Sequence, residues 1–178
     1  HARPWPLFFE QQPSSSLFVL ERVFTENRFT LFLTRSREGA ETPLAGNPMR
    51  IPFLTPKPTP LIEVICVAYK RYGPLKVLVQ SFLNQTAPNW KLTVIHDGAD
   101  EEFSRIMAAF AAEAPDNIAY RATEERFNDY GHSLRDLGLK NAQSDYVLVT
   151  NDDNYYIPKF IEIVSEAIQK SGADAVLF

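Results

Sequence analysis

Short apolar runs alternate with amphipathic stretches along residues 61–178. An apolar run of about four to eight residues is typical of a buried strand, and apolar positions recurring every three or four residues are typical of a helix. Their alternation predicts an α/β fold, in which helices flank a mostly parallel sheet. The predicted strands cover residues 61–68, 90–96, 117–122, 145–150 and 173–178.

The predicted helices are marked by their first residues. Proline is favoured at the first helical position, so one helix is predicted to begin at Pro74. The side chain of Asp100 can cap a second helix, and a third is predicted over residues 131–143. The last helix has Pro158 in its first turn and an apolar stripe over residues 157–168.

Proline divides the chain unevenly, because nine of the 13 prolines fall in the first 60 residues. Four of them lie between Pro52 and Pro60, where the missing N–H groups favour an extended linker. The chain is therefore predicted to have a Pro-rich extension at residues 1–60 and a domain at residues 61–178. Within the extension, β-branched and aromatic runs at 17–24 and 29–34 predict a β-hairpin.

Composition and charge narrow the functional classes. The 178 residues carry 18 Lys and Arg against 22 Asp and Glu, so no overall positive field exists for a nucleic-acid backbone. The single cysteine, Cys66, can form no disulfide within the chain, which favours a reducing compartment. No run approaches the roughly 20 apolar residues of a membrane-spanning helix. We therefore expect a cytoplasmic protein, free or peripheral at the membrane. Because the chain opens with His1 instead of Met, we also expect a processed or trimmed start.

Polar residues follow three of the predicted strands, where open parallel sheets bind their ligands. Asp152 and Asp153 follow the fourth strand, and paired carboxylates suit a hard divalent cation such as Mn²⁺ or Mg²⁺. The alternative is that residues 151–154 form a turn whose side chains bond to the local backbone. Both interpretations remain open at this point.

The other strand ends offer contacts for a nucleotide. Tyr69 could stack on a base, and Asp97 could accept a hydrogen bond from a base imide or a ribose hydroxyl. Lys70, Arg71 and Arg135 could neutralise phosphate. Tyr69 could equally lie at the edge of the core, and Asp97 with the glycine after it is also a common turn pair.

Several other sites are excluded or disfavoured. The chain has neither a glycine-rich dinucleotide or P-loop motif nor the Gly-x-Ser-x-Gly elbow. His96 and His132 lack ligand spacing to each other or to Cys66, so both histidines are predicted to be structural and a zinc site is disfavoured.

Five stretches, in this order, resemble the motifs of the family-2 glycosyltransferases of GT-A fold. They are residues 63–69 (EVICVAY), 81–86 (SFLNQT), 94–100 (VIHDGAD), 135–142 (RDLGLKNA), and 151–154 (NDDN) followed by Pro158. The resemblance implies a Rossmann-like nucleotide-diphospho-sugar transferase fold and the nucleotide-sugar-binding, N-terminal half of such an enzyme.

Carried over by position, the resemblance implies a role for several residues. The turn formed by Val67, Ala68 and Tyr69, together with Asp97, would hold the uracil of a UDP-sugar. The remaining three would act on the rest of the donor: Arg135 near the diphosphate, Asp152 on ribose, sugar or metal, and Asp153 as the better metal ligand.

Two departures from the family pattern are visible. His96 replaces the first of a pair of aspartates, and Asn151 stands where many members carry the first aspartate of the metal motif. In the family, the general base lies beyond the metal motif, so the catalytic base is not identified here. We accordingly expect this chain to bind a donor and to transfer no sugar.

The leading hypothesis is an inverting glycosyltransferase that binds a UDP-sugar through a divalent metal and transfers the sugar to an unknown saccharide, lipid or protein acceptor. The first alternative is a non-catalytic module that binds nucleotide-sugar and metal. The second is a nucleotidyltransferase, which the absence of a glycine-rich, basic phosphate loop after the first strand of the domain disfavours.

Overall fold

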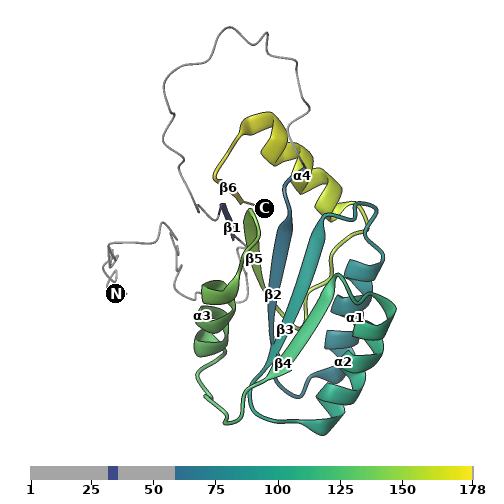
Figure 1. The fold of residues 1–178 in the computed structure, drawn as a ribbon, viewed down its shortest axis with the longest axis vertical. Coiled ribbons are helices and arrows are strands. Elements are labelled where there is room, and N and C mark those ends of the chain that lie inside the picture. Colours follow the sequence, from purple (N-terminus) through teal and green to yellow (C-terminus); the bar gives the residue numbers. More distant parts are fainter. Residues whose placement is uncertain (1–31, 36–58, 178) are drawn as a thin grey trace, which may run out of the picture.

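The computed structural model describes residues 32–35 and 59–177, and its elements are shown in Figure 1. The strands form one six-stranded sheet in the order β4-β3-β2-β5-β1-β6. The strands are β1 (Phe32–Arg35), β2 (Ile62–Ala68), β3 (Trp90–His96), β4 (Ile118–Ala122), β5 (Tyr146–Asn151) and β6 (Ala175–Leu177). The helices are α1 (Tyr72–Leu83), α2 (Glu101–Glu113), α3 (His132–Asn141) and α4 (Phe160–Ser171).

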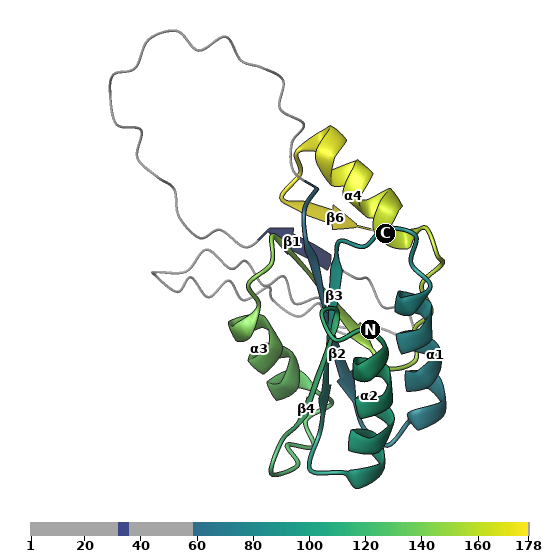
Figure 2. The ribbon, with the colours of Figure 1, turned by 45° about the vertical axis from the view of Figure 1, so that its right-hand side comes forward.

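Helices cover both faces of the sheet, as the two ribbon views show (Figures 1 and 2). The larger core cluster joins α1, α2 and α4 to one face, and the smaller one joins α3 to the other. Side chains of β2 alternate between the clusters: Val64 and Cys66 belong to the first, and Ile65 and Val67 to the second. Because both faces are covered, β2 is apolar along nearly its whole length. The predicted α/β class is confirmed.

The order of the strands creates one switch point. From β2 the chain proceeds through β3 to β4 on one side, and then crosses to β5 on the other side of β2. β2 is parallel to both β3 and β5, and Val67 lies opposite Asn151 at the carboxyl ends. Ligands of open parallel sheets bind outside the carboxyl ends at such a point.

Helix α3 lies close to the sheet because it carries glycine at a contact position. A Cβ at Gly138 would meet a methyl group of Ile65 and lie 3.3 Å from Cδ1 of Ile95. The absence of that atom lets the helix axis approach β2 and β3. Gly131, directly before the helix, lies against Val67, so the beginning of α3 lies beside the carboxyl end of β2.

Two helix starts differ from the prediction. Helix α1 begins at Tyr72, so Pro74 is its third residue, where a backbone N–H would have no partner within the helix. Pro158 precedes α4, and its carbonyl accepts a hydrogen bond from the Thr86 N–H at 2.8 Å. The predicted cap of α2 is confirmed, because Asp100 accepts from the Phe103 N–H at 2.7 Å.

The extension expected at residues 1–60 contributes a strand to the sheet. β1 pairs antiparallel with β5 on one side and with β6 on the other. The expected boundary at residue 61 therefore does not separate all of the first segment from the sheet. The first run of the predicted hairpin, residues 17–24, lies outside the described residues. The second run, residues 29–34, was expected to pair with the first. Residues 32–35 instead pair with β5 and β6.

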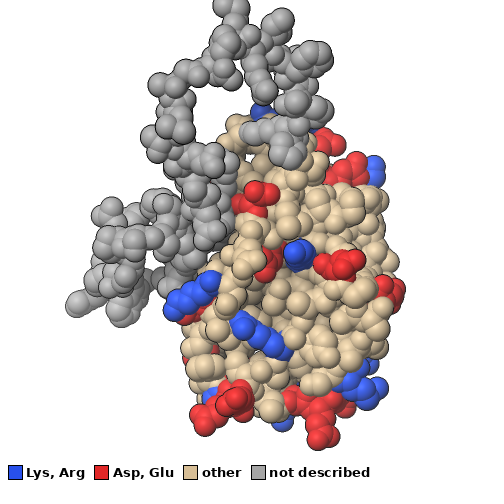
Figure 3. Space-filling model, viewed as in Figure 1, with Lys and Arg blue, Asp and Glu red and all other residues tan. Residues whose placement is uncertain are grey.

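Within residues 32–35 and 59–177, the structure contains no helix that is both long and apolar enough to cross a membrane. On the face shown in Figure 3, basic and acidic side chains are interspersed.

Candidate functional site

A cavity of about 430 Å³ lies at the carboxyl ends of β2, β3 and β5, against the loop that leads into α3. All seven residues to which the family resemblance assigns a donor or metal role lie in its wall, as does Arg71, whereas Lys70 does not. The lining consists of Val67, Ala68, Tyr69, Arg71, Asp97, Arg126, Asn128, Tyr130, Gly131, Leu134, Arg135, Asn151, Asp152 and Asp153.

The turn after β2 is held in place by His96. The Lys70 N–H donates to Nε2 of His96 at 3.2 Å, and the other ring nitrogen lies 2.8 Å from the carbonyl oxygen of Gly98. Since a carbonyl only accepts and an amide N–H only donates, this arrangement has Nδ1 donating to Gly98 and Nε2 accepting from Lys70. His96 is buried and stacks on Phe103, with ring centroids 4.7 Å apart. This geometry supports the structural role predicted for His96, and it positions Tyr69 at the rim of the cavity.

Asp97 anchors the loop between β4 and α3. Its two carboxylate oxygens accept hydrogen bonds from the Phe127 N–H at 2.7 Å and from the Asn128 N–H at 3.0 Å. Nε of Arg126 lies 3.6 Å from the same carboxylate, and its guanidinium carbon lies 3.8 Å from the ring centroid of Tyr69. Tyr69 and Asp97, two of the four residues predicted to hold the base, are thus both in contact with residues 126–128.

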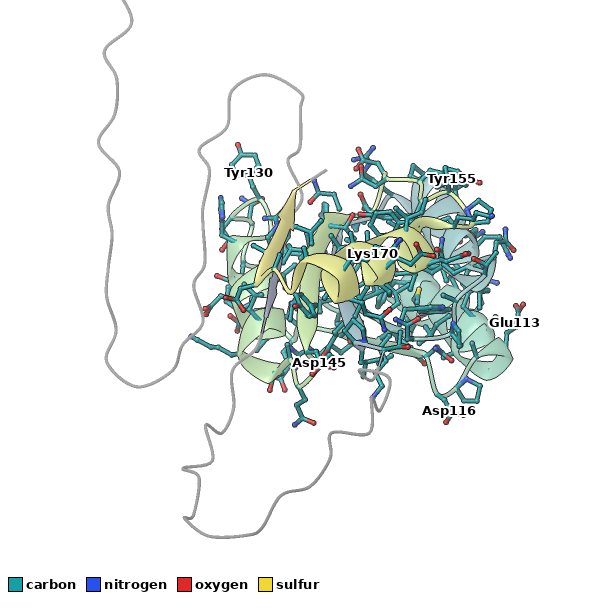
Figure 4. The ribbon with its side chains drawn as sticks, turned by 90° about the horizontal axis from the view of Figure 1, so that it is seen from above. Glu113, Asp116, Tyr130, Asp145, Tyr155 and Lys170 are labelled. Atoms are coloured by element: carbon teal, nitrogen blue, oxygen red, sulfur yellow. The ribbon has the colours of Figure 1, made fainter. Side chains whose placement is uncertain are left out.

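The same loop supplies cavity residues that sequence reasoning missed, among them Arg126, Asn128 and Tyr130. Asn128 and Tyr130 adopt positive φ angles of 54° and 59°, and Gly131 follows at 82°. The available signal was the run from Asn128 to Gly131, whose Asn, Asp and Gly residues favour turns. Tyr130 is 89% exposed and points away from the ribbon (Figure 4).

Arg135 reaches the cavity from α3. Its Nη2 donates to Oδ1 of Asn151 at 2.7 Å, and its Nη1 donates to the carbonyl of Tyr130 at 2.9 Å. Asn151, which departs from the family's metal motif, therefore acts here as a neutral acceptor that orients an arginine. His132 is the first residue of α3 and is exposed outside the cavity lining.

Asp152 and Asp153 lie side by side at the end of β5. Asp152 is buried and accepts from the Tyr69 N–H at 3.4 Å. Nη1 of Arg71 lies 3.0 Å from Oδ2 of Asp153 and 3.5 Å from Oδ1 of Asp152. These partners belong to the turn after β2, and Nδ2 of Asn154 donates to the Thr150 hydroxyl at 2.9 Å. Residues 152 and 153 do form a turn, as the alternative predicted, and their carboxylates contact the turn after β2.

The two carboxylates fit a hard divalent cation. Oxygens from both converge on one nitrogen of Arg71, so a cation at that position can contact both carboxylates. Among the residues that the structure describes, no group of three or more His, Cys, Asp or Glu side chains could hold a metal. Such a pair suits Mn²⁺ or Mg²⁺, which take one or two protein carboxylates and complete their shell with water and substrate phosphate.

Burial raises the pKa of the Asp152 carboxyl, and the Arg71 charge only partly opposes this effect. We therefore expect Asp152→Asn to melt about 2 °C higher than the wild type at pH 7 in EDTA. The burial cost arises as pH climbs through the raised pKa, so the difference vanishes below the ordinary value of 3.8. Thermal unfolding measured from pH 3 to pH 8 tests this, and a variant less stable than the wild type at pH 7 contradicts it.

The sequence model of the family described as glycosyl transferase family 2 matches residues 63–178. The chain belongs to this family. Among curated relatives, glycosyltransferase GlyG of Streptococcus pneumoniae serotype 4 is 24% identical over 117 residues, which cover 66% of this chain and 38% of that protein. An uncharacterized glycosyltransferase of Haemophilus influenzae is 22% identical over 111 residues, covering 62% and 35%. The chain therefore spans less than two fifths of the length of these relatives.

Two groups of solved structures share the fold. S. aureus TarS 1-349, solved in complex with UDP-GlcNAc, matches with a TM-score of 0.58 and 20% identity, covering 64% of this chain and 32% of that one. Mannosyltransferase PcManGT from Pyrobaculum calidifontis, solved with GDP-Man and Mn²⁺, matches with a TM-score of 0.53 and 18% identity, covering 64% and 33%. The Rossmann-like GT-A fold predicted for residues 61–178 is confirmed.

Proposed function

We propose that the cavity binds the nucleotide of a UDP-sugar and that the protein is an inverting glycosyltransferase. The observation that carries the proposal is the cavity itself, in which an aromatic ring, a pair of carboxylates and three arginines meet at the carboxyl ends of parallel strands. Family membership supports sugar transfer, and the TarS complex with UDP-GlcNAc supports a uridine nucleotide.

Different residues of the cavity would contact different parts of the donor. Val67, Ala68, Tyr69 and Asp97 would hold the base, and Arg135, oriented by Asn151, would face the diphosphate. Asp152 would contact the ribose and share a divalent cation with Asp153. When bound, that cation supplies positive charge that stabilises the departing nucleoside diphosphate. Holding the leaving group at one end of the cavity would leave the sugar carbon open to an acceptor hydroxyl from the opposite side.

We expect UDP to bind at least about tenfold more tightly with Mn²⁺ than in EDTA, because the cation bridges the carboxylates and the diphosphate. Asp153→Ala is expected to remove most of this difference, because it removes the proposed metal ligand. The Asp153 side chain is 33% exposed and so is accessible to a cation. Isothermal titration calorimetry with UDP, ADP and GDP measures both effects.

Asp136→Ala is the matched control, because it removes one aspartate of α3 that is exposed and pairs with Lys140. It should leave the effect of Mn²⁺ on UDP affinity unchanged. Equal UDP affinity with and without Mn²⁺ contradicts the metal site. ADP or GDP binding as tight as UDP contradicts the uracil assignment and leaves only a diphosphate site.

The second candidate function is a non-catalytic module that binds nucleotide-sugar and metal. The observation that favours it is that, among the residues that the structure describes, those lining the cavity include every residue assigned to the donor or the metal and none assigned as a general base. A radiolabelled UDP-sugar assay against saccharide, lipid and protein acceptors separates the two functions. Transfer supports the enzyme, and tight binding without transfer by the full-length protein supports the module. For either function, we propose a cytoplasmic location, free or peripheral at the membrane.

A further inference from the structure

Arg71 contacts both members of the acidic pair through one atom. Its Nη1 is 3.0 Å from Oδ2 of Asp153 and 3.5 Å from Oδ1 of Asp152. The Asp152 side chain is 6% exposed and the Arg71 side chain 53% exposed, so the carboxylate is fixed in the wall while the arginine extends along the surface. The guanidinium thus occupies the position from which a divalent cation would contact both carboxylates.

A guanidinium and a divalent cation cannot share this position, because they overlap and repel each other. The geometry points to Arg71 as a resident counter-cation of Asp152 and Asp153, which must leave before a metal binds and which couples metal binding to nucleotide binding. This inference rests on the proposed nucleotide and metal site.

The cavity offers the displaced guanidinium a new partner. Arg71 belongs to the lining of the same cavity, so a bound diphosphate lies within reach of its long, half-exposed side chain. Phosphate oxygens accept from a guanidinium in the same manner as a carboxylate does. Nucleotide draws Arg71 off the carboxylates and so favours metal, and by linkage metal favours nucleotide by the same factor.

The test compares Mn²⁺ dissociation constants, measured by electron paramagnetic resonance, with and without saturating UDP. Without UDP, Arg71→Gln is expected to bind Mn²⁺ about tenfold more tightly than the wild type, because no guanidinium has to be displaced. UDP should then increase the Mn²⁺ affinity of Arg71→Gln by a smaller factor than that of the wild type. Arg71→Lys, which keeps a cation, should remain close to the wild type.

Lys70→Gln is the matched control. It removes the same charge from the adjacent residue, whose ammonium lies over the Tyr69 ring, 5.6 Å from the centroid. We expect its Mn²⁺ affinity without UDP to change by less than about twofold, since solvent screens an exposed charge that is paired with neither carboxylate. Thermal unfolding checks that each variant is folded, and Arg71→Ala serves as a second charge-removing variant.

Equal Mn²⁺ affinity in the wild type and Arg71→Gln, including no detectable binding to either, overturns the inference. An equal gain in Lys70→Gln also overturns it, because the effect is then one of net charge. Failure of UDP to bind any variant counts against the proposed function instead, and the comparison without nucleotide still decides the role of Arg71.

Discussion

Phe82→Ala is expected to lower the free energy of unfolding by about 3–5 kcal/mol, as found for large-to-small changes at buried aromatic residues. Phe82 is fully buried, and its ring centroid lies 4.8 Å from that of Tyr156 and 5.7 Å from that of Trp90. The ring therefore joins α1 to β3 and to the segment that follows the acidic pair. Urea denaturation followed by circular dichroism measures the loss.

Val77→Ala provides the control on the same helix. Val77 is 53% exposed, so its truncation should change the free energy of unfolding by no more than about 0.5 kcal/mol. A loss below about 1 kcal/mol for Phe82→Ala would show that the site collapses around the missing ring. It would contradict the role of the Phe82 ring in joining α1 to β3 and to the segment that follows the acidic pair.

The elements that could be predicted from the sequence are those marked by residues within or next to them. Runs of apolar residues identified β2, β3, β4 and β5 to within one residue at each end, and Asp100 marked the start of α2 because its side chain bonds to the N–H three residues later. The place of β1 could not be predicted in this way. Its pairing with β5 joins residues more than 100 positions apart, and a run of four residues carries no information about its partner.

The candidate site likewise has a part that could be predicted from local signals and a part that could not. Residues at strand ends could be placed together because parallel strands bring their carboxyl ends to one edge. The loop at residues 123–131 could not be placed from the sequence, because its position depends on which distant side chains accept hydrogen bonds from its backbone N–H groups. Asp97, the residue after β3, supplies two of these acceptors, and Phe127 lies 30 residues further along the chain. The residue directly before this anchored pair, Arg126, lies over the Tyr69 ring.

Asp97→Ala is expected to lower the free energy of unfolding by about 2 kcal/mol. A hydrogen bond to a charged group contributes about 1.5–3 kcal/mol, and two are lost, but water can partly replace them because Phe127 and Asn128 are exposed. Hydrogen exchange at these two amides should accelerate by at least about tenfold, since they lose their acceptors. Denaturant unfolding and exchange followed by NMR measure the global and the local effect.

Asp97→Asn separates the anchoring role from the proposed contact with the base. Its single amide oxygen can keep one of the two backbone bonds, so the loss of stability should be about half that of Asp97→Ala. If the carboxylate also accepts from the imide N–H of uracil, Asp97→Asn weakens UDP binding more than ADP binding, because adenine has no imide N–H at the corresponding edge. Equal weakening of both nucleotides would mean that Asp97 acts only through the loop, by holding Arg126 over the Tyr69 ring. The base would then be recognised by the turn after β2.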